Sequence, residues 1–304
     1  MTAVLIVLAA MVMLGIYAWY IEPRFLQVKR QEVGVASDRL QNELRILFIS
    51  DLHVGRYNST SLLKAKCRRL ERLHRRHPFD LILLGGDLID REARFLPDLT
   101  KSLNILAGWQ LPFFAVLGNH DYFAFSELSP LKAALAEVRC QLLCGEAVEV
   151  SCAGQTVLLI GLNDLETDQG YRESQAEYPA WEEYSRRAAS LSLYSQFDQV
   201  SPGLPRVILA HNPDAAYLPG KQPADLVLSG HTHGGQTLFH RLFGRYISHF
   251  MPQSSFIAWS GRKEVQGTTL IVSRGIQGSW LPLRFLIPPD VQEITLRPVE
   301  VASS

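Results

Sequence analysis

The sequence predicts an α/β domain preceded by one membrane-spanning helix, and three features support this. From residue 44 onward, short apolar runs typical of buried strands alternate with amphipathic stretches typical of helices. Polar motifs rich in Asp and His directly follow several of the apolar runs, which is where α/β folds place their chemistry. Ahead of this domain, residues 2–21 carry no charged side chain. A helix of about 20 residues is long enough to cross a bilayer.

Composition narrows the functional classes. The chain has 304 residues and is 47% hydrophobic, enough for one large or two small domains with a sizeable core. Its formal net charge is zero, so overall charge indicates no polyanionic partner. Apart from residues 64–76 there is no basic surface of the kind a nuclease needs, and we expect no nucleic-acid partner. The four cysteines form no CxxC pair and are expected to be free thiols in a reducing compartment: Cys67, Cys140, Cys144 and Cys152.

Residues 1–22 are expected to form an uncleaved transmembrane anchor that holds the chain at a membrane through residues 2–21. Trp19 and Tyr20 lie at one end, where interfacial aromatic residues are expected. The alternative is a cleaved signal peptide, which normally carries basic residues before its apolar run and a small-x-small site after it. Three basic residues follow the stretch: Arg24, Lys29 and Arg30. The positive-inside rule then places the rest of the chain in the cytoplasm at the inner membrane, with export as the alternative.

The domain is expected to span residues 44–300, after a linker at residues 23–43. Apolar runs predict strands at residues 44–50, 80–84, 112–117, 206–210, 225–229, 268–273 and 291–296. Periodic patterns predict helices at residues 60–77, 99–107 and 130–139. Residues 141–162 alternate and turn like consecutive strands, while residues 164–201 are polar and are expected to be an insertion.

The expected helix at residues 60–77 is amphipathic. One arc carries its apolar side chains, and the opposite face is expected to be basic: Lys64, Lys66, Arg68, Arg69, Arg72, Arg75 and Arg76. Such a face is either solvated or in contact with anionic lipid headgroups.

Five short motifs contain most of the histidines that could bind a metal or act in catalysis. They are SDLHVG at 50–55, GGDLID at 85–90, GNHD at 118–121, AHNP at 210–213 and GHTHGGQ at 230–236. Asp51 and His53 are two residues apart, so both point to one side of an extended segment, and His231 and His233 do the same. Carboxylate, imidazole and amide ligands together suit manganese, iron, zinc or cobalt better than an all-oxygen magnesium or calcium site.

This ordered series resembles the calcineurin-like metallophosphoesterase family, whose pattern is D-x-H, G-D, G-N-H-[D/E], H and G-H-x-H. The resemblance covers about residues 44–296 and implies a four-layer αββα sandwich. It implies two divalent metal ions, with manganese first among the candidates. The first ion would be held by Asp51, His53 and His233, the second by Asn119, His211 and His231, and Asp87 would bridge both. His120 would face the substrate phosphate, with Asp121 orienting it.

Two ions in such a site can clamp the attacking and leaving oxygens of a phosphoryl group. Within the family, IEPRFL at residues 21–26 and the stretch at residues 273–290 resemble a branch of bacterial membrane-associated or exported phosphoesterases of the YkuE/YaeI type. A related membrane-anchored group hydrolyses UDP-2,3-diacylglucosamine in lipid A synthesis. The resemblance therefore implies cleavage of a phosphodiester or pyrophosphate bond in an amphiphilic, phosphate-containing substrate.

Two segments could define that substrate. Residues 237–259 are aromatic and basic, and either face acyl chains or the membrane or form a core hairpin. The insertion at residues 164–201 is either a cap over the site or a surface loop. Two alternatives to a lipid-linked substrate remain: a membrane-tethered phosphodiesterase for soluble nucleotides, and a non-catalytic metal-binding scaffold.

Overall fold

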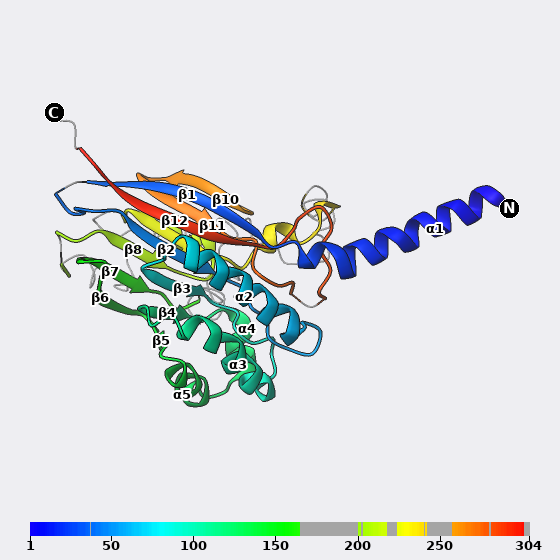
Figure 1. Ribbon diagram of the computed structural model, residues 1–304, viewed down its shortest axis with the longest axis horizontal. Helices are drawn as coiled ribbons and strands as arrows, with labels where there is room; N and C mark the ends of the chain where they lie inside the picture. The colour runs from blue at the N-terminus through cyan, green and yellow to red at the C-terminus, as the bar shows by residue number, and fades with distance from the viewer. Residues whose placement is uncertain are drawn as a thin grey trace, which may run out of the picture.

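Two six-stranded sheets lie against each other and form the body of the protein (Figure 1). The computed structural model describes every residue except 37, 165–199, 202, 218–223, 240, 242–256, 280 and 301–304. The first sheet has the order β1 (Gln27–Ala36), β12 (Asp290–Val299), β2 (Leu44–Ile49), β3 (Leu81–Gly85), β4 (Phe113–Val116) and β5 (Gln141–Leu142). The second has the order β10 (Gly261–Val265), β11 (Thr268–Val272), β9 (Leu226–Ser229), β8 (Arg206–Leu209), β7 (Gln155–Gly161) and β6 (Glu146–Cys152).

The core has separate layers because successive strand residues point to opposite faces of a sheet. Ile46 and Phe48 of β2 pack in a cluster that includes Val207 and Leu226 of the second sheet. The intervening Leu47 belongs to a different cluster, on the helical side. Burying one such large apolar side chain stabilises the fold by about 1.5–3 kcal/mol.

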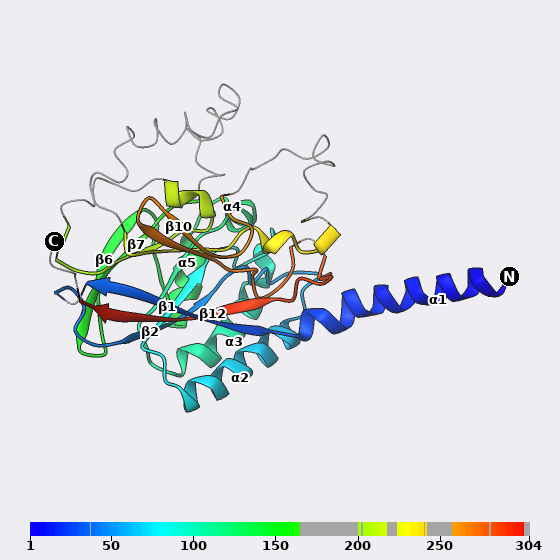
Figure 2. The same cartoon turned by 90° about the horizontal axis from the view of Figure 1, so that it is seen from above.

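Helices cover the outer face of the first sheet. Buried side chains of α2 (Thr60–Arg76), α3 (Leu96–Ala107) and α5 (Ser129–Glu137) pack in the same cluster as β2, β3 and β4. Over the outer face of the second sheet, the described residues place the 3₁₀ helix Pro213–Tyr217, on the opposite side of the molecule from α2 and α3 (Figure 2). The predicted α/β fold is confirmed, with two mixed sheets. The expected insertion at residues 164–201 lies almost wholly outside the described residues.

The expected linker was wrong in part, because β1 lies within it. The strand pairs in parallel with β12 along its whole length, from Gln27 opposite Asp290 to Ala36 opposite Val299. Only Val33 and Val35 of β1 are buried. β1 is an edge strand with charged residues, as is β10, and the apolar runs that revealed the central strands are therefore missing from both.

One residue of the expected basic face of α2 is buried. The Lys66 side chain is 4% exposed, and its Nζ donates a hydrogen bond to the Ile276 carbonyl. Position 66 lies three residues after Leu63 and four before Leu70, so the helical period places it on the buried stripe. Helix α2 begins after Ser59, whose hydroxyl accepts a hydrogen bond from the Leu62 N–H and caps the helix.

The N-terminal helix projects away from the body (Figure 1). No residue of α1 (Thr2–Ile16) is buried, and the continuous helical segment Thr2–Arg24 is long and apolar enough to cross a membrane. Its base, formed by the turns Tyr17–Ile21 and Glu22–Arg24, packs on the domain. The Arg284 N–H donates to the Ala18 carbonyl at 2.9 Å, and the Leu286 N–H donates to Glu22 Oε2 at 2.7 Å. The base of the helix is therefore joined to the loop between β11 and β12.

Candidate metal centre

The predicted metal-binding residues all come from the carboxyl ends of strands. β2, β3 and β4 are parallel neighbours in one sheet, and β8 and β9 are parallel neighbours in the other. These strands are short and fully or almost fully buried. Polar residues follow directly after the end of each strand. The residues that follow each strand carry the predicted side chains: Asp51 and His53 after β2, Asp87 after β3, Asn119 and His120 after β4, His211 after β8, and His231 and His233 after β9.

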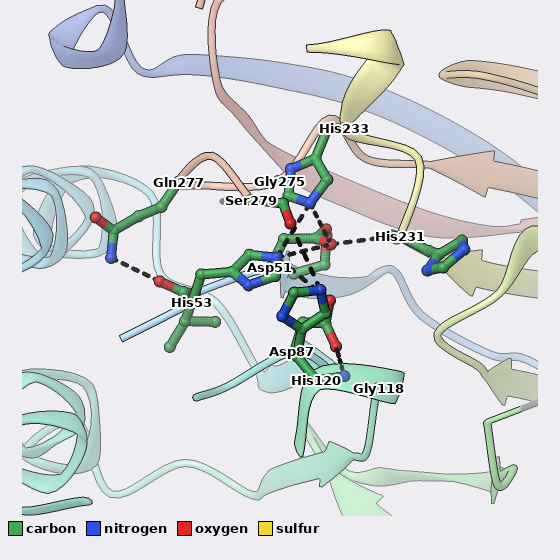
Figure 3. A network of polar contacts seen from close by, with 12 residues as sticks. Asp51, His53, Asp87, Gly118, His120, His231, His233, Gly275, Gln277 and Ser279 are labelled. Atoms are coloured by element: carbon green, nitrogen blue, oxygen red, sulfur yellow. Dashed lines mark hydrogen bonds and ion pairs between the residues drawn. The ribbon is translucent and has the colours of Figure 1, made fainter. Parts of the chain in front are cut away.

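Four of these residues form one tight cluster (Figure 3). One ligand atom from each of Asp51, His53, Asp87 and His233 lies within 4.8 Å of the others. The Nε2 atoms of His53 and His233 are 3.1 Å apart. His53 Nε2 lies 3.3 Å from Asp87 Oδ2, and His233 Nε2 lies 3.4 Å from Asp51 Oδ1. All four side chains are buried.

A second group of ligand atoms adjoins the first through Asp87. His211 Nε2 is also 3.3 Å from Asp87 Oδ2, and His231 Nδ1 is 3.1 Å from His211 Nε2. Asn119 precedes His120, whose backbone N–H donates to Asp87 Oδ1 at 2.9 Å. The buried Asn119 Oδ1 has no hydrogen-bond partner among the described residues. The structure therefore brings all seven predicted ligands to one end of the two sheets, with Asp87 between the two groups.

The protonation of these histidines fits a cation site. Burial lowers the pKa of His53 to about 3 and holds the pKa of His233 well below its usual value, so both rings are neutral at pH 7. His211 Nδ1 lies 2.7 Å from the Gly85 carbonyl, which fixes a proton on Nδ1 and directs Nε2 at Asp87. Neutral imidazole nitrogens gathered around carboxylates are a set that divalent transition metals bind.

Asp87 and His211 behave as an ion pair in this arrangement. Burial favours the neutral form of Asp87, but the adjacent His211, by its charge and its hydrogen bond, outweighs burial and holds the pKa of Asp87 well below its usual value. Burial likewise disfavours the charged form of His211, but Asp87 outweighs it and holds the pKa of His211 well above its usual value. A cation bound by both side chains would displace the His211 proton.

Five of the predicted ligands have left-handed backbone conformations. Their φ angles are 56° at Asp51, 39° at His53, 51° at Asp87, 68° at His231 and 51° at His233. Non-glycine residues with such angles cost about 1–3 kcal/mol each and concentrate at functional sites. Gly275, at φ 77°, approaches from the β11–β12 loop, where a Cβ would lie 2.6 Å from the Asp51 Cβ. Strain and close packing thus fix the direction of the ligands.

His120 faces the cluster, but its partner differs from the expected one. His120 Nδ1 lies 2.8 Å from Asp90 Oδ1, and Ser279 Oγ lies 3.5 Å from His120 Nε2. Asp121 was expected to orient the ring, and this prediction was wrong. His120 and Asp121 are consecutive on the first turn of α4 (Asn119–Ala124), where neighbouring side chains point in different directions.

Asp121 instead holds the backbone of two ligand loops. Its carboxylate accepts hydrogen bonds from the N–H groups of Leu88 and Ile89, both at 2.9 Å, and of Gly118 at 3.0 Å. Burial and the nearby Asp87 charge raise the pKa of Asp121 to about 7 against these hydrogen bonds. Asp121 therefore ties the loop after β3 to the start of α4.

The roles of two polar residues that support the site are not revealed by any of the sequence motifs. Asp90 lies in the GGDLID motif, but only the fold shows that it reaches His120. Arg284 is 1% exposed, and its guanidinium donates to the carbonyls of His233, at 2.9 Å, and Arg274, at 2.7 Å. The single arginine in the apolar stretch WLPLRFLIPP was a signal of a buried cation, because such a residue must find several acceptors.

Several known proteins resemble this chain over most of its length. A protein of Aquifex aeolicus described as an uncharacterized metallophosphoesterase is 28% identical over 94% of this chain and 97% of its own. Phosphodiesterase YaeI of Escherichia coli is 31% identical over 72% of this chain and 71% of its own. UDP-2,3-diacylglucosamine pyrophosphatase LpxG of Chlamydia trachomatis is 27% identical over 94% of this chain and 93% of its own.

The family assignment follows from the same region that builds the site. Residues 44–235 match the calcineurin-like phosphoesterase family, and this range contains all seven predicted ligands together with His120 and Asp121. Relatives named as a phosphodiesterase and a pyrophosphatase agree with hydrolysis of a phosphoric ester or anhydride. With its strand-end cluster of Asp and His residues, this chain belongs to the calcineurin-like phosphoesterase family and is a metal-dependent hydrolase.

Proposed function

We propose that a two-metal centre in this protein cleaves a phosphodiester or pyrophosphate bond of an amphiphilic substrate at a membrane surface. One observation carries the proposal: Arg284 contacts both the metal cluster and the N-terminal helix. Its backbone N–H donates to the Ala18 carbonyl, and its guanidinium donates to the carbonyl of the predicted ligand His233. If residues 2–21 span a membrane, the site lies beside the membrane surface.

The geometry supports a distinct role for each predicted ligand. Asp51, His53 and His233 would hold one ion, Asn119, His211 and His231 would hold the other, and Asp87 would bridge them. The position of Asp87 Oδ2, 3.3 Å from both His53 Nε2 and His211 Nε2, supports the bridging role. The mixed nitrogen and oxygen ligands favour manganese, with iron, zinc or cobalt as alternatives. When bound, the two ions supply the positive charge that clamps the attacking and leaving oxygens of a phosphoryl group.

His120 is the proposed proton donor to the leaving oxygen. The Asp90 carboxylate accepts a hydrogen bond from His120 Nδ1–H and so holds the ring with Nε2 facing away from Asp90. That leaves the proton on Nε2 available to the substrate. Ser279 Oγ, on the Nε2 side, lies within reach of the same proton or of a phosphate oxygen. Asp121 acts on the site only through the loops that it holds.

Exposed apolar side chains around the site support an amphiphilic substrate. They lie on the base of the N-terminal helix and on loops that carry or adjoin residues of the site: Tyr20, Tyr57, Phe239 and Leu281. Phe239 is 60% exposed and belongs to the aromatic segment at residues 237–259. Of that segment, residues 240 and 242–256 lie outside the described residues. The name of the Chlamydia relative makes UDP-2,3-diacylglucosamine a specific candidate.

The proposed location is the inner membrane, with the catalytic domain in the cytoplasm. Support comes from the apolar helix Thr2–Arg24 and from the basic residues after its apolar part. A protein of Bos taurus described as a transmembrane protein with a metallophosphoesterase domain is 27% identical over 84% of this chain, although this chain covers only 53% of that protein.

The decisive comparison is between substrates that differ only in their acyl chains. The full chain in detergent with manganese would be assayed for release of UMP from UDP-2,3-diacylglucosamine and from the same sugar nucleotide without acyl chains. We expect kcat/KM to be at least about 100-fold higher for the acylated substrate, since each buried methylene contributes about 0.8 kcal/mol. Equal values, with bis(p-nitrophenyl) phosphate hydrolysis confirming an active enzyme, would favour a phosphodiesterase for soluble nucleotides.

A further inference from the structure

A pocket lies where the base of the N-terminal helix meets α2 and the β11–β12 loop. It is open, has a volume of about 470 Å³ and contains none of the predicted metal ligands. Its lining comes from residues that are far apart in the sequence: Tyr17, Glu22, Phe25, Leu26, Gln27, Arg69, Leu286 and Pro288. A pocket of this size accommodates a small-molecule ligand.

Two buried oxygen atoms in this lining need a hydrogen-bond donor. Glu22 is 1% exposed; its Oε2 accepts the Leu286 N–H, but its Oε1 has no hydrogen-bond partner among the described residues. The buried Oε1 of Gln27 also lacks a partner within the described part of the chain. Leaving a buried carboxylate oxygen without a partner is unfavourable, so these atoms favour a ligand that donates hydrogen bonds and carries positive charge.

The rest of the lining has complementary chemistry. Arg69, an exposed residue of α2, contributes a cation that can bind a phosphate. Phe25 and Leu286 are 56% and 52% exposed and provide apolar surface continuous with the base of the helix. Because α1 directly precedes the lining residue Tyr17 and has no buried residue, a ligand headgroup in the pocket could be followed by acyl chains along α1.

We propose that this pocket binds the phosphoethanolamine headgroup of a membrane phospholipid. The ammonium donates to Glu22 Oε1 and Gln27 Oε1, and the phosphate pairs with Arg69. One negative and one positive side chain match this zwitterion. Phosphocholine has no N–H to donate, and phosphoglycerol has no positive charge to pair with Glu22. The site rests on the proposed membrane span of residues 2–21, but not on the proposed substrate or on the two-metal assignment.

Lipid retention in the full chain tests the site. The protein would be reconstituted in nanodiscs with equal amounts of phosphatidylethanolamine, phosphatidylcholine and phosphatidylglycerol, transferred to mild detergent, and the retained lipids identified by native mass spectrometry. We expect phosphatidylethanolamine to be enriched about tenfold over phosphatidylcholine, the effect of one charge-assisted hydrogen bond. No enrichment, or a preference for phosphatidylglycerol, would overturn the proposal.

Three variants show whether the lining residues are responsible. Glu22→Gln keeps an oxygen for the Leu286 N–H but removes the charge, and should abolish the preference for phosphatidylethanolamine. Arg69→Ala should lower retention of all three lipids, while Arg68→Ala, at the neighbouring exposed position outside the lining, should match the wild type. A Glu22→Gln variant that keeps the wild-type preference contradicts the assignment. Unchanged bis(p-nitrophenyl) phosphate hydrolysis by each variant shows that the domain is folded.

One further experiment distinguishes an error in the proposed membrane span from an error in the proposed headgroup site. Extraction of native membranes with alkaline carbonate leaves a spanning protein in the pellet. A chain that moves to the supernatant refutes the span and the headgroup site together. A chain that stays in the pellet but shows no headgroup preference refutes the site alone.

Discussion

At the scale of single residues, the geometry of the site depends on which groups three aspartate side chains contact. Asp87 faces both histidine groups through Oδ2 and accepts the His120 N–H through Oδ1. Asp90 accepts from the His120 ring, while the hydrogen bonds that Asp121 accepts from described residues come from backbone N–H groups. Three aspartates of similar chemistry therefore occupy three separate positions: between the two histidine groups, beside the proposed proton donor, and against the backbone of two loops.

The pair formed by His120 and Asp90 gives the first prediction. His120→Ala should lower kcat by about 10²–10⁴-fold, the usual contribution of a proton donor, with metal content unchanged. Asp90→Asn should cause a smaller loss, and the double variant should be no slower than His120→Ala, since Asp90 acts through His120. Steady-state kinetics with metal analysis checks this. Wild-type rates for His120→Ala would remove the histidine from the mechanism.

Lys66 gives a prediction about pH and stability. Burial is the main cause that holds the pKa of Lys66 well below its usual value, and the nearby positive charge of Arg284 adds to it. The folded state then binds fewer protons at this group than the unfolded state, whose lysine titrates near about 10.4. The contribution of Lys66 to the free energy of unfolding must therefore increase as pH rises toward that value, and decrease as pH falls.

Lys66→Met, which keeps the length of the side chain, isolates that contribution. Between pH 7 and 9, the free energy of unfolding of the wild type should rise relative to the variant by up to about 1.4 kcal/mol per pH unit. Denaturant unfolding in detergent at three pH values measures it. A difference that does not change with pH would mean that the buried amine stays charged.

At the scale of elements, the β11–β12 loop is the main structural support of the site. Arg284 links its own loop to the one after β9, through the carbonyls of Arg274 and His233. Its NH2 group also lies 3.3 Å from His233 Nδ1. The loop places Gly275 against Asp51 and Ser279 near His120. One loop therefore contacts a ligand from each sheet and the proposed proton donor.

Arg284→Lys tests that support. Lysine keeps the charge but lacks the planar fork that reaches several carbonyls at once. We expect metal affinity to fall about 10–100-fold, as for other changes to residues that orient metal ligands. Competition with a fluorescent chelator measures the dissociation constants, and Arg274→Lys, a partly exposed arginine in the same loop, is the matched control. Equal affinities for Arg284→Lys and wild type would show that Arg284 serves packing alone.

The elements also show what the sequence could and could not predict. Strands buried on both faces, such as β2, β3, β8 and β9, were predicted correctly because each is a continuous apolar run that is visible in the local sequence alone. Their ends carried the five motifs, and the resemblance of those motifs to the family implied the ligand set. β1 and β10 were missed because edge strands here are charged. Asp90 and Arg284 were missed because their contacts join loops distant in the sequence, which no local pattern encodes.

At the scale of the whole molecule, the N-terminal helix and the hydrolase domain form one continuous structure at their junction. Ala18, Glu22 and Pro23 are buried against the domain, whereas no residue of α1 is buried. The segment thus has two parts: an exposed apolar helix suited to a bilayer, and a base that is part of the domain.

Two truncations separate these parts. Removing residues 1–16 should abolish membrane attachment but leave bis(p-nitrophenyl) phosphate hydrolysis and domain stability close to wild type. Removing residues 1–24 also removes Glu22 and its bond to the Leu286 N–H, and should cost about 1.5–3 kcal/mol of stability. Denaturant unfolding of the two truncated proteins measures the difference. Equal stability would show that the base is not part of the folded domain.

The most direct test of the central claim is anomalous diffraction from crystals grown with manganese, recorded at the manganese edge. We expect two peaks per chain about 3.5–4 Å apart, with the Asp87 carboxylate between them. One peak should lie beside Asp51, His53 and His233 and the other beside Asn119, His211 and His231. A single peak, or two peaks of which only one contacts Asp87, would contradict the account.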